Sequence, residues 1–166
     1  MRRSLLIGVA ALLITGCVDR ASRVLGPNAP IALTRITPNA PSIVYYSGLV
    51  DPARLVIDNP ATLASVWARA FADESEPPPI PRVDFRRERV IVAALGGRAT
   101  GGYGIELASA DVEGGQVVVD VVSTSPGQGC AVTQALTQPV DMAKIALSAM
   151  GIRFVEHATV RNCSTP

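Results

Sequence analysis

Prolines and glycines are the feature that most restricts the fold of this chain. The 166 residues include 13 prolines and 14 glycines, and both residue types interrupt regular secondary structure. Their number and spread leave room for little long helix. We therefore expect short elements joined by many turns.

The first seventeen residues have the organisation of a secretory signal. Arg2 and Arg3 precede a short apolar run that ends at Cys17, and a basic start, an apolar core and a small-residue cleavage point mark such signals. The run is too short to span a bilayer comfortably. The small residues before the cysteine resemble the bacterial lipobox, which implies cleavage before Cys17 and acylation of its thiol. The alternative is an ordinary signal peptide with a chance cysteine.

This interpretation divides the chain into three regions. Residues 1–16 are the expected signal peptide, 17–42 a flexible, proline-rich tether, and 43–166 a single globular domain. As a coil, the tether would reach about 25–30 Å, and two or more acyl chains would anchor it stably. We expect a lipid-anchored protein of the cell envelope. Val18, not Asp, follows Cys17. If the source has an outer membrane, this resembles the pattern of lipoproteins sent to its periplasmic face.

The charge balance does not indicate a nucleic-acid partner. The precursor has 15 basic and 14 acidic side chains, and removal of Arg2 and Arg3 leaves 13 against 14, a net charge of −1. Nucleic-acid-binding domains carry a basic excess, so we expect none here.

Two cysteines remain beyond the predicted anchor, Cys130 and Cys163. Outside the cytoplasm an isolated pair is most simply a disulfide, which the chain-entropy model values at ~3–4 kcal/mol for a loop of this size. A redox or nucleophilic role is the alternative, but the sequence contains no Cys-x-x-Cys motif.

Hydrophobic patterning predicts an α+β fold, a mostly antiparallel β-sheet that carries one packed amphipathic helix. The helix is expected over 61–72, where Asn59 and Pro60 supply start signals and apolar residues recur at helical spacing around Trp67. We interpret Trp67 as a core residue that packs on the sheet, with ligand stacking as the alternative. Strands are expected over 42–48, 54–59, 88–96, 103–111, 116–125, 140–149 and 152–160. Residues 140–149 could instead be helical on propensity.

Gly114-Gly115 predicts a two-residue hairpin turn between two of these strands. That turn would set Leu107 opposite Val122 and Ala108 opposite Val121. The two pairs face opposite ways and both are apolar, so we expect the hairpin to be covered on both sides. The continuous apolar run at 88–96 likewise indicates a strand buried on both faces.

Two segments before that strand allow more than one interpretation. The proline-rich segment 76–81 is expected to be an extended spacer, with a proline-rich ligand for a partner as the alternative. Four arginines between 82 and 89 alternate with Asp84 and Glu88. They indicate a solvated turn with paired charges, or a basic rim for an acidic partner.

A glycine-rich loop follows the strand at 88–96. Residues 96–104 contain five glycines in nine positions, which permits positive φ angles and close strand approach. The loop lacks the GxxxxGK[ST] pattern and leads into a strand, so it is not a phosphate cradle. Its composition alone indicates no more than a tight connection between strands.

The segment LGGRATGGYGIEL resembles the signature of the PrcB C-terminal domain, a family found in subunits of secreted protease complexes. The match runs through Gly97, Arg98, Ala99 and Thr100-Gly101-Gly102-Tyr103, with Ala99 where the family usually has proline. The segment VTQALTQPV (132–140) resembles the family's second patch. The similarity is expected over about 60–147.

The resemblance implies an exported, non-catalytic subunit that binds a protein partner, an exported protease in the family's named member. We expect partner contacts from a set of loop residues: Arg98, Thr100, Gly101, Gly102, Tyr103 and Gly104. A fainter resemblance to chagasin-type inhibitors of cysteine proteases makes inhibition the alternative, with ATGGYG (99–104) and PGQG (126–129) as the inhibitory loops. A small-ligand-binding lipoprotein is the third.

The sequence offers little for catalysis. It holds one histidine, His157, and no GxSxG elbow or metal-spaced His/Cys cluster, whereas acid–base catalysis needs titratable groups within reach of one another. We expect no enzyme activity, cofactor or metal.

Overall fold

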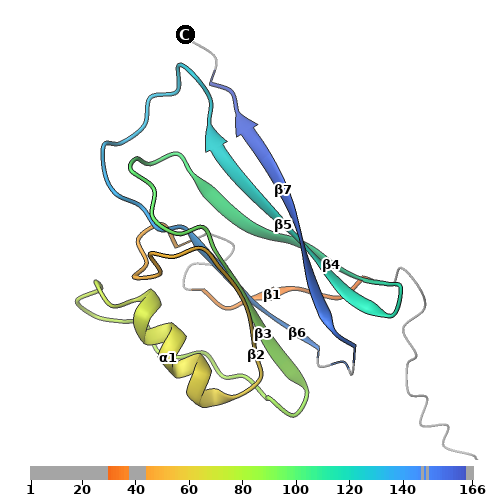
Figure 1. Ribbon diagram of the computed structural model, residues 1–166. Helices are drawn as coiled ribbons and strands as arrows, with labels where there is room; N and C mark the ends of the chain where they lie inside the picture. Colours follow the sequence, from red (N-terminus) through yellow and green to blue (C-terminus); the bar gives the residue numbers. More distant parts are fainter. Residues whose placement is uncertain (1–29, 38–43, 147, 149, 164–166) are drawn as a thin grey trace, which may run out of the picture.

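The computed structural model describes residues 30–37, 44–146, 148 and 150–163. Within these ranges the chain forms seven strands and one helix (Figure 1). In chain order they are β1 (Thr34–Arg35), β2 (Ala53–Ile57), α1 (Pro60–Ala70), β3 (Glu88–Ala94), β4 (Gly104–Glu113), β5 (Gln116–Pro126), β6 (Val140–Ala146) and β7 (Ile152–Arg161).

The strands form two sheets, so the expectation of a single sheet is wrong. The first sheet has the order β1-β6-β3-β2, and all its neighbours are antiparallel. The second has the order β4-β5-β7, in which β4 and β5 are antiparallel but β5 and β7 are parallel. Parallel neighbours need a crossover connection, and here the chain between β5 and β7 passes through β6 of the first sheet. The predicted α+β character and the mostly antiparallel pairing are confirmed.

The first sheet is the middle layer between α1 and the second sheet. Alternate residues of β3 explain the arrangement: Val90, Val92 and Ala94 join the core beneath the helix, whereas Ile91 and Ala93 join the core between the sheets. Because successive side chains of a strand point to opposite faces, burial on both sides requires the continuous apolar run seen in the sequence.

Helix α1 begins and packs as its sequence predicts. The Asn59 side chain accepts a hydrogen bond from the Thr62 backbone N–H at 2.8 Å, and the apolar stripe that includes Leu63 and Trp67 is buried against the sheet. The indole Nε1 of Trp67 donates to the Pro78 carbonyl at 2.9 Å. Trp67 is therefore a core residue, as expected, and it also ties the proline-rich segment to the helix.

The β4–β5 hairpin has the predicted turn but not the predicted register. Gly114 and Gly115 both have positive φ, and Glu113 pairs with Gln116 across the turn. A bulge at Ala108 then shifts the pairing, so Leu107 lies opposite Val121 and not opposite Val122. The bulged residue has no partner of its own, and strict alternation cannot locate it.

Residues 30–37 belong to the folded domain, so the prediction of a flexible tether over 17–42 is wrong for these residues. Pro30 bridges to Asp111 of β4, and the Ile31 N–H donates to the Ala110 carbonyl at 2.7 Å. The chain then crosses to the first sheet as β1, where Arg35 pairs with Ala143 of β6. Backbone pairing and apolar packing both fix this segment, because Ile31 and Leu33 join the core between the sheets and Ile36 packs against the core beneath the helix. Residues 1–16, Cys17 and the rest of the predicted tether lie outside the described residues.

Of two other strand predictions, the first needs correction and the second is confirmed over most of its length. In the segment expected as a strand over 42–48, the described residues make isolated bridges at Val44 and Tyr46 only. The segment 140–149 is a strand, not a helix, over its first seven residues, because it fills the position between β1 and β3.

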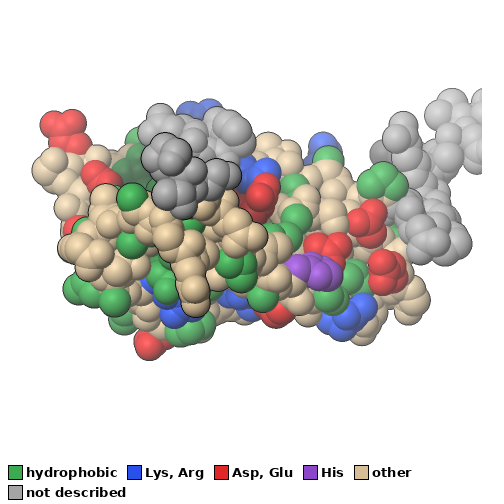
Figure 2. Space-filling model, turned by 90° about the horizontal axis from the view of Figure 1, so that it is seen from above, with side chains coloured by type: hydrophobic (Ala, Val, Ile, Leu, Met, Phe, Trp, Pro, Cys, Tyr) green, Lys and Arg blue, Asp and Glu red, His purple; other side chains and the backbone are tan. Residues whose placement is uncertain are grey.

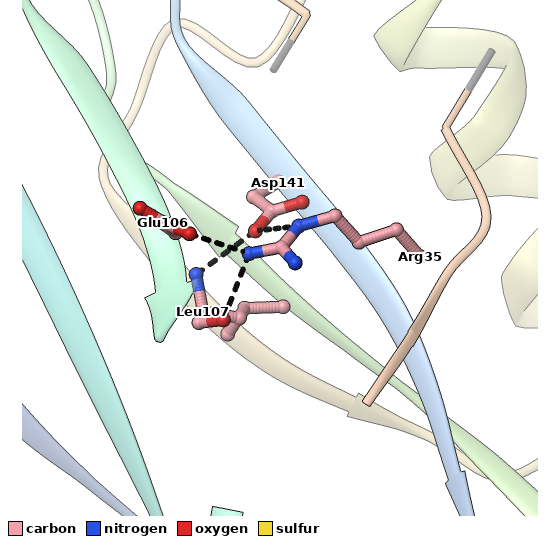
Figure 3. Close-up of polar contacts among 4 residues, drawn as sticks. All are labelled: Arg35, Glu106, Leu107 and Asp141. Atoms are coloured by element: carbon pink, nitrogen blue, oxygen red, sulfur yellow. Dashed lines mark hydrogen bonds and ion pairs between the residues drawn. The ribbon is translucent and has the colours of Figure 1, made fainter. Parts of the chain in front are cut away.

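Arg35 and Asp141 close the edge of the second sheet where β4 has no neighbouring strand. Asp141 is fully buried, and its Oδ2 accepts from the Leu107 N–H at 2.9 Å and from Arg35 Nε at 3.1 Å. The Arg35 Nη2 donates to the Leu107 carbonyl at 3.0 Å and to Glu106 at 2.9 Å (Figure 3). The two side chains thus satisfy both backbone groups of Leu107, as a neighbouring strand would.

Candidate functional site

The glycine-rich loop predicted as the contact region crosses from the first sheet to the second at one end of the molecule. It connects β3 to β4 and lies beside the long connection from β5 to β6 (Figure 1). Arg98 and Thr137 exchange two backbone hydrogen bonds, of 2.8 and 2.9 Å, and the Gly101 N–H donates to the Thr133 carbonyl at 2.9 Å. The loop is therefore held along its length by residues 133–137.

The loop glycines serve close packing. A Cβ on Gly101 would overlap Thr133 Oγ1, and one on Gly102 would lie 2.8 Å from Val132 Cγ1, too near for an ordinary contact. Gly102 also has a φ of +87°, a conformation that favours glycine. Gly101 and Gly104 are buried. These two predicted contact residues therefore pack inside the loop and expose little surface to a partner, whereas Gly102 is half-buried.

Tyr103 is the central side chain of the site. Its ring is half-buried and packs against the core between the two sheets. The guanidinium carbon of Arg98 lies 5.7 Å from the ring centroid, within the range of a cation–π contact. Thr100 is fixed by a hydrogen bond, because its backbone carbonyl accepts from the buried Thr137 hydroxyl at 3.0 Å. The structure therefore brings Arg98, Thr100 and Tyr103 together with part of their surfaces open to solvent.

Tyr103 separates two hollows, and Thr124 borders both of them. The smaller hollow, about 230 Å³, is lined by Tyr45, Gly102, Tyr103, Gly104, Ile105, Glu106, Val122, Thr124 and Arg161. The larger, about 380 Å³, is lined by Leu95, Arg98, Tyr103, Ser123, Thr124, Ser125, Ala158 and Thr159. The second volume lies within the range of small-molecule and cofactor pockets, ~300–1,000 Å³.

The predicted disulfide is present and lies next to this site. Cys130 and Cys163 are bonded, with their Cα atoms 5.0 Å apart. The bond joins the SPGQGC loop to the end of β7, where the Gly127 N–H donates to the Arg161 carbonyl at 2.9 Å. The Arg161 side chain in turn reaches the Gly102 carbonyl at 3.4 Å. The two glycine-containing loops and the C-terminal strand therefore meet at one place.

Several exposed apolar side chains surround the same end of the molecule. Leu136 is 70% exposed and precedes the residue that bridges to Arg98, and Tyr45, 46% exposed, lines the smaller hollow. Val160 is 61% exposed on β7, beside Gly127. Viewed from above, apolar, acidic and basic side chains are interspersed over the surface (Figure 2). Protein contact surfaces combine apolar and polar side chains, in about the proportions found on the rest of a protein surface.

The sequence did not single out Tyr45, Leu136 or Arg161. Tyr45 is brought to the site by a backbone contact with Gln138, a long-range pairing that leaves no local pattern. Arg161 could have been found, because it stands two residues before Cys163, whose partner Cys130 was expected to pin the neighbouring loop.

The single histidine lies away from this loop, in a cluster on the second sheet. The Ser109 hydroxyl donates to Asp120 Oδ2 at 2.7 Å, and Asp120 Oδ1 lies 2.7 Å from His157 Nε2. The His157 and Ser109 contacts, in that order, hold the pKa of Asp120 below its ordinary value. A serine nucleophile is activated by a histidine that stands between it and the acid. Here the acid stands between the other two, so Ser109 is a partner of Asp120 and not of His157.

Neither a metal-binding cluster nor a membrane-spanning helix occurs among the described residues. No group of three or more His, Cys, Asp or Glu side chains there is placed to hold a metal ion. None of the helices in those ranges combines the length and apolarity that a bilayer span requires.

Comparison with known proteins identifies a family. No curated protein and no solved structure matches this chain. The family model described as PrcB C-terminal matches residues 89–146, a segment that runs from β3 to β6 and contains the whole Tyr103 loop. Helix α1 and the proline-rich segment, included in the expected similarity over 60–147, lie outside the matched residues. The resemblance found in the sequence is thus confirmed over residues 89–146, the segment from β3 to β6 that matches the PrcB C-terminal family model.

Proposed function

We propose that this protein is a non-catalytic interaction subunit that binds a protein partner through the surface around Tyr103. The observation that carries the proposal is the position of Tyr103. Its half-buried ring stands between two hollows, at the place where two loops and the C-terminal strand meet. Aromatic side chains at the centre of a surface, bordered by polar groups that exclude water, are frequent anchors of protein interfaces.

The support around Tyr103 also favours a binding surface. The loop is fixed by backbone hydrogen bonds to 133–137, and a disulfide lies beside it. A surface that is already ordered loses less conformational entropy when a partner binds. The exposed side chains of Tyr45, Leu136 and Val160 supply apolar area around it.

The nature of the partner rests on the family. The match to the PrcB C-terminal model supports a role in a protease complex, and we take the partner to be an exported protease. The basic start, apolar run and Cys17 of the sequence support export and acylation. In this proposal, Cys17 carries the lipid anchor and the domain acts in the cell envelope.

The decisive experiment is a pull-down from detergent-solubilised membranes with the full chain as bait. A co-purifying protease that remains active supports the subunit role. A protease that loses activity when bound favours the inhibitor role, and the absence of any protein partner favours a small-ligand-binding protein. Intact mass measurement of the bait tests the anchor, because an unmodified Cys17 in a soluble product would remove the lipoprotein assignment.

Substitution at Tyr103 tests the site itself. Tyr103→Ala should reduce partner capture at least tenfold, while the melting temperature shows whether the domain stays folded. Tyr46→Ala is the control, because Tyr46 is also a tyrosine but lines neither hollow; it is 55% exposed, whereas Tyr103 is half-buried. If Tyr103→Ala unfolds the domain instead, the loop is structural and the contact site lies elsewhere.

A further inference from the structure

We infer that the larger hollow beside Tyr103 binds the C-terminal residue of a partner polypeptide, with Arg98 as the ligand of its terminal carboxylate. The inference rests on the proposed function and specifies which part of the partner is recognised. It follows from the charge, the hydroxyl groups and the apolar lining of this hollow.

Arg98 carries a charge that no neighbouring carboxylate neutralises. None of the ion pairs within the described ranges includes Arg98. Its one side-chain hydrogen bond runs from Nη1 to the carbonyl of Gly97, at 3.2 Å. A guanidinium has five N–H donors in a planar fork that matches a carboxylate. Most of these donors therefore remain available, and the Tyr103 ring lies close enough to the guanidinium to hold its orientation.

The two hollows differ in how they would receive an anion. The smaller one contains Arg161 but is also lined by Glu106, a carboxylate that is paired with Arg35 and leaves no net positive charge to spare beyond Arg161. The larger hollow contains Arg98 and is lined by no acidic residue. The larger hollow is therefore the better of the two sites for a carboxylate.

The hydroxyl groups of the larger hollow suit the amide group next to a terminal carboxylate. Ser123 and Ser125 donate their hydroxyl hydrogens to the backbone carbonyls of His157 and Thr159, each at 3.4 Å. Their oxygen atoms keep lone pairs that can accept a hydrogen bond. The backbone N–H of a bound terminal residue is a donor of the required kind.

The apolar lining distinguishes a chain terminus from an acidic side chain. Leu95, Tyr103 and Ala158 offer apolar surface in the same hollow as Arg98. A C-terminal residue presents a carboxylate and an apolar side chain on the same Cα atom. An internal Asp or Glu brings its carboxylate on methylene groups alone and would leave this surface unused.

NMR titration of the full chain in detergent micelles tests the inference with three probes. N-acetyl-leucine has a terminal carboxylate and an apolar side chain, N-acetyl-leucine amide lacks the charge, and N-acetyl-aspartate amide carries a side-chain carboxylate only. We expect N-acetyl-leucine to shift the Arg98 Nε–Hε and Tyr103 ring signals saturably, with a dissociation constant on the order of millimolar for so small a ligand. The other two probes should bind at least tenfold more weakly.

Variants make the result specific to Arg98. Arg98→Gln should weaken N-acetyl-leucine binding at least tenfold, and Arg98→Lys should have a smaller effect because it keeps the charge but not the fork. Arg86→Gln is the control, because Arg86 is exposed and lines neither hollow. Unchanged methyl spectra would show that the variants are folded.

Three results would overturn the inference. These are equal binding of the leucine amide, equal binding of the aspartate amide, and no saturable shift with N-acetyl-leucine. The titration needs no protein partner, so it can fail while the pull-down succeeds. In that case the proposed function would stand and only the recognition of a chain terminus would fall.

Discussion

Arg54 donates to both carboxylate oxygens of Glu156, from Nε at 2.7 Å and from Nη2 at 2.8 Å. Arg54 belongs to β2, the edge of the first sheet, and Glu156 to β7, the edge of the second. Arg35 makes a corresponding link at the other side, between β1 and β4. The two sheets are thus joined at both edges by an arginine whose partners include a carboxylate.

The Arg54–Glu156 pair should contribute modestly to stability. Glu156 is 51% exposed, and ion pairs that are open to water are worth about 0.2–1 kcal/mol. We expect a coupling energy near the upper end, about 1 kcal/mol, because the contact is bidentate. A double-mutant cycle with Arg54→Gln and Glu156→Gln in urea unfolding measures it. A coupling energy indistinguishable from zero would show that the sheets need no link at this edge.

Asp141 should be far more sensitive to substitution than Glu106, although both carboxylates bind Arg35. Asp141 is fully buried and accepts from the Leu107 N–H, whereas the Glu106 side chain is 55% exposed. Asp141→Ala leaves the buried Leu107 N–H without a partner and removes the buried one of the two carboxylates that bind Arg35, at a cost of about 3–5 kcal/mol. Glu106→Gln should cost less than about 1 kcal/mol. Chemical unfolding compares the two, and equal losses would contradict this account of the β4 edge.

The sequence was informative where a local pattern determines the structure. The stripe around Trp67 located α1, the continuous apolar run of β3 predicted burial on both faces, and Gly114-Gly115 predicted the hairpin turn. Each of these signals lies within a few residues and depends on the periodicity of one element. The same holds for the glycine-rich loop, whose glycines permit close packing on 133–137.

The parts that were missed depend on contacts distant in the chain. The bulge at Ala108 follows Leu107, whose backbone groups are held by Arg35 and Asp141, and no alternation pattern records this. The two-residue strand β1 carries no apolar run and is defined by its pairing with β6. The parallel pairing of β5 with β7 requires a crossover connection, which here runs through β6 of the first sheet. Tyr45 and Arg161 reach the site for the same long-range reasons.

The glycines of the Tyr103 loop should not respond equally to alanine. At Gly101 an added Cβ would overlap Thr133 Oγ1, whereas at Gly97 the nearest atom would be the Val50 carbonyl oxygen at 3.7 Å, an ordinary contact. Overpacking of this kind costs about 1–3 kcal/mol, so Gly101→Ala should lower the free energy of unfolding by that amount. Gly97→Ala should change it by less than about 0.5 kcal/mol. Similar losses for both variants would mean that the loop does not pack as described.

Loss of the disulfide should destabilise the domain and loosen the site together. The bond encloses a sequence separation of 33 residues, for which the chain-entropy model gives about 3–4 kcal/mol. Cys130→Ser with Cys163→Ser should lower the free energy of unfolding accordingly, and amide exchange should accelerate in β7 and the SPGQGC loop before it does in β3. Uniform acceleration throughout the domain would show that the bond contributes only to global stability.

The carboxyl groups of Asp120 and Asp141 should titrate on opposite sides of the ordinary aspartate value, about 3.9. Hydrogen bonds from His157 first and Ser109 next lower the pKa of Asp120, whereas burial, the largest influence, raises the pKa of Asp141. A lowered folded-state pKa contributes stability that is present above the unfolded value and is lost as the pH falls through the folded value. The raised pKa of Asp141 acts in the opposite sense: its contribution to stability is present below the unfolded value and is lost as the pH rises through the folded value.

Carboxyl-carbon NMR titration measures the pKa of each of the two aspartates separately. His157→Ala should return the pKa of Asp120 toward 3.9 and leave Asp141 unchanged, because His157 contacts Asp120 alone of the two. An Asp120 pKa that does not move in this variant would show that His157 is not its stabilising partner.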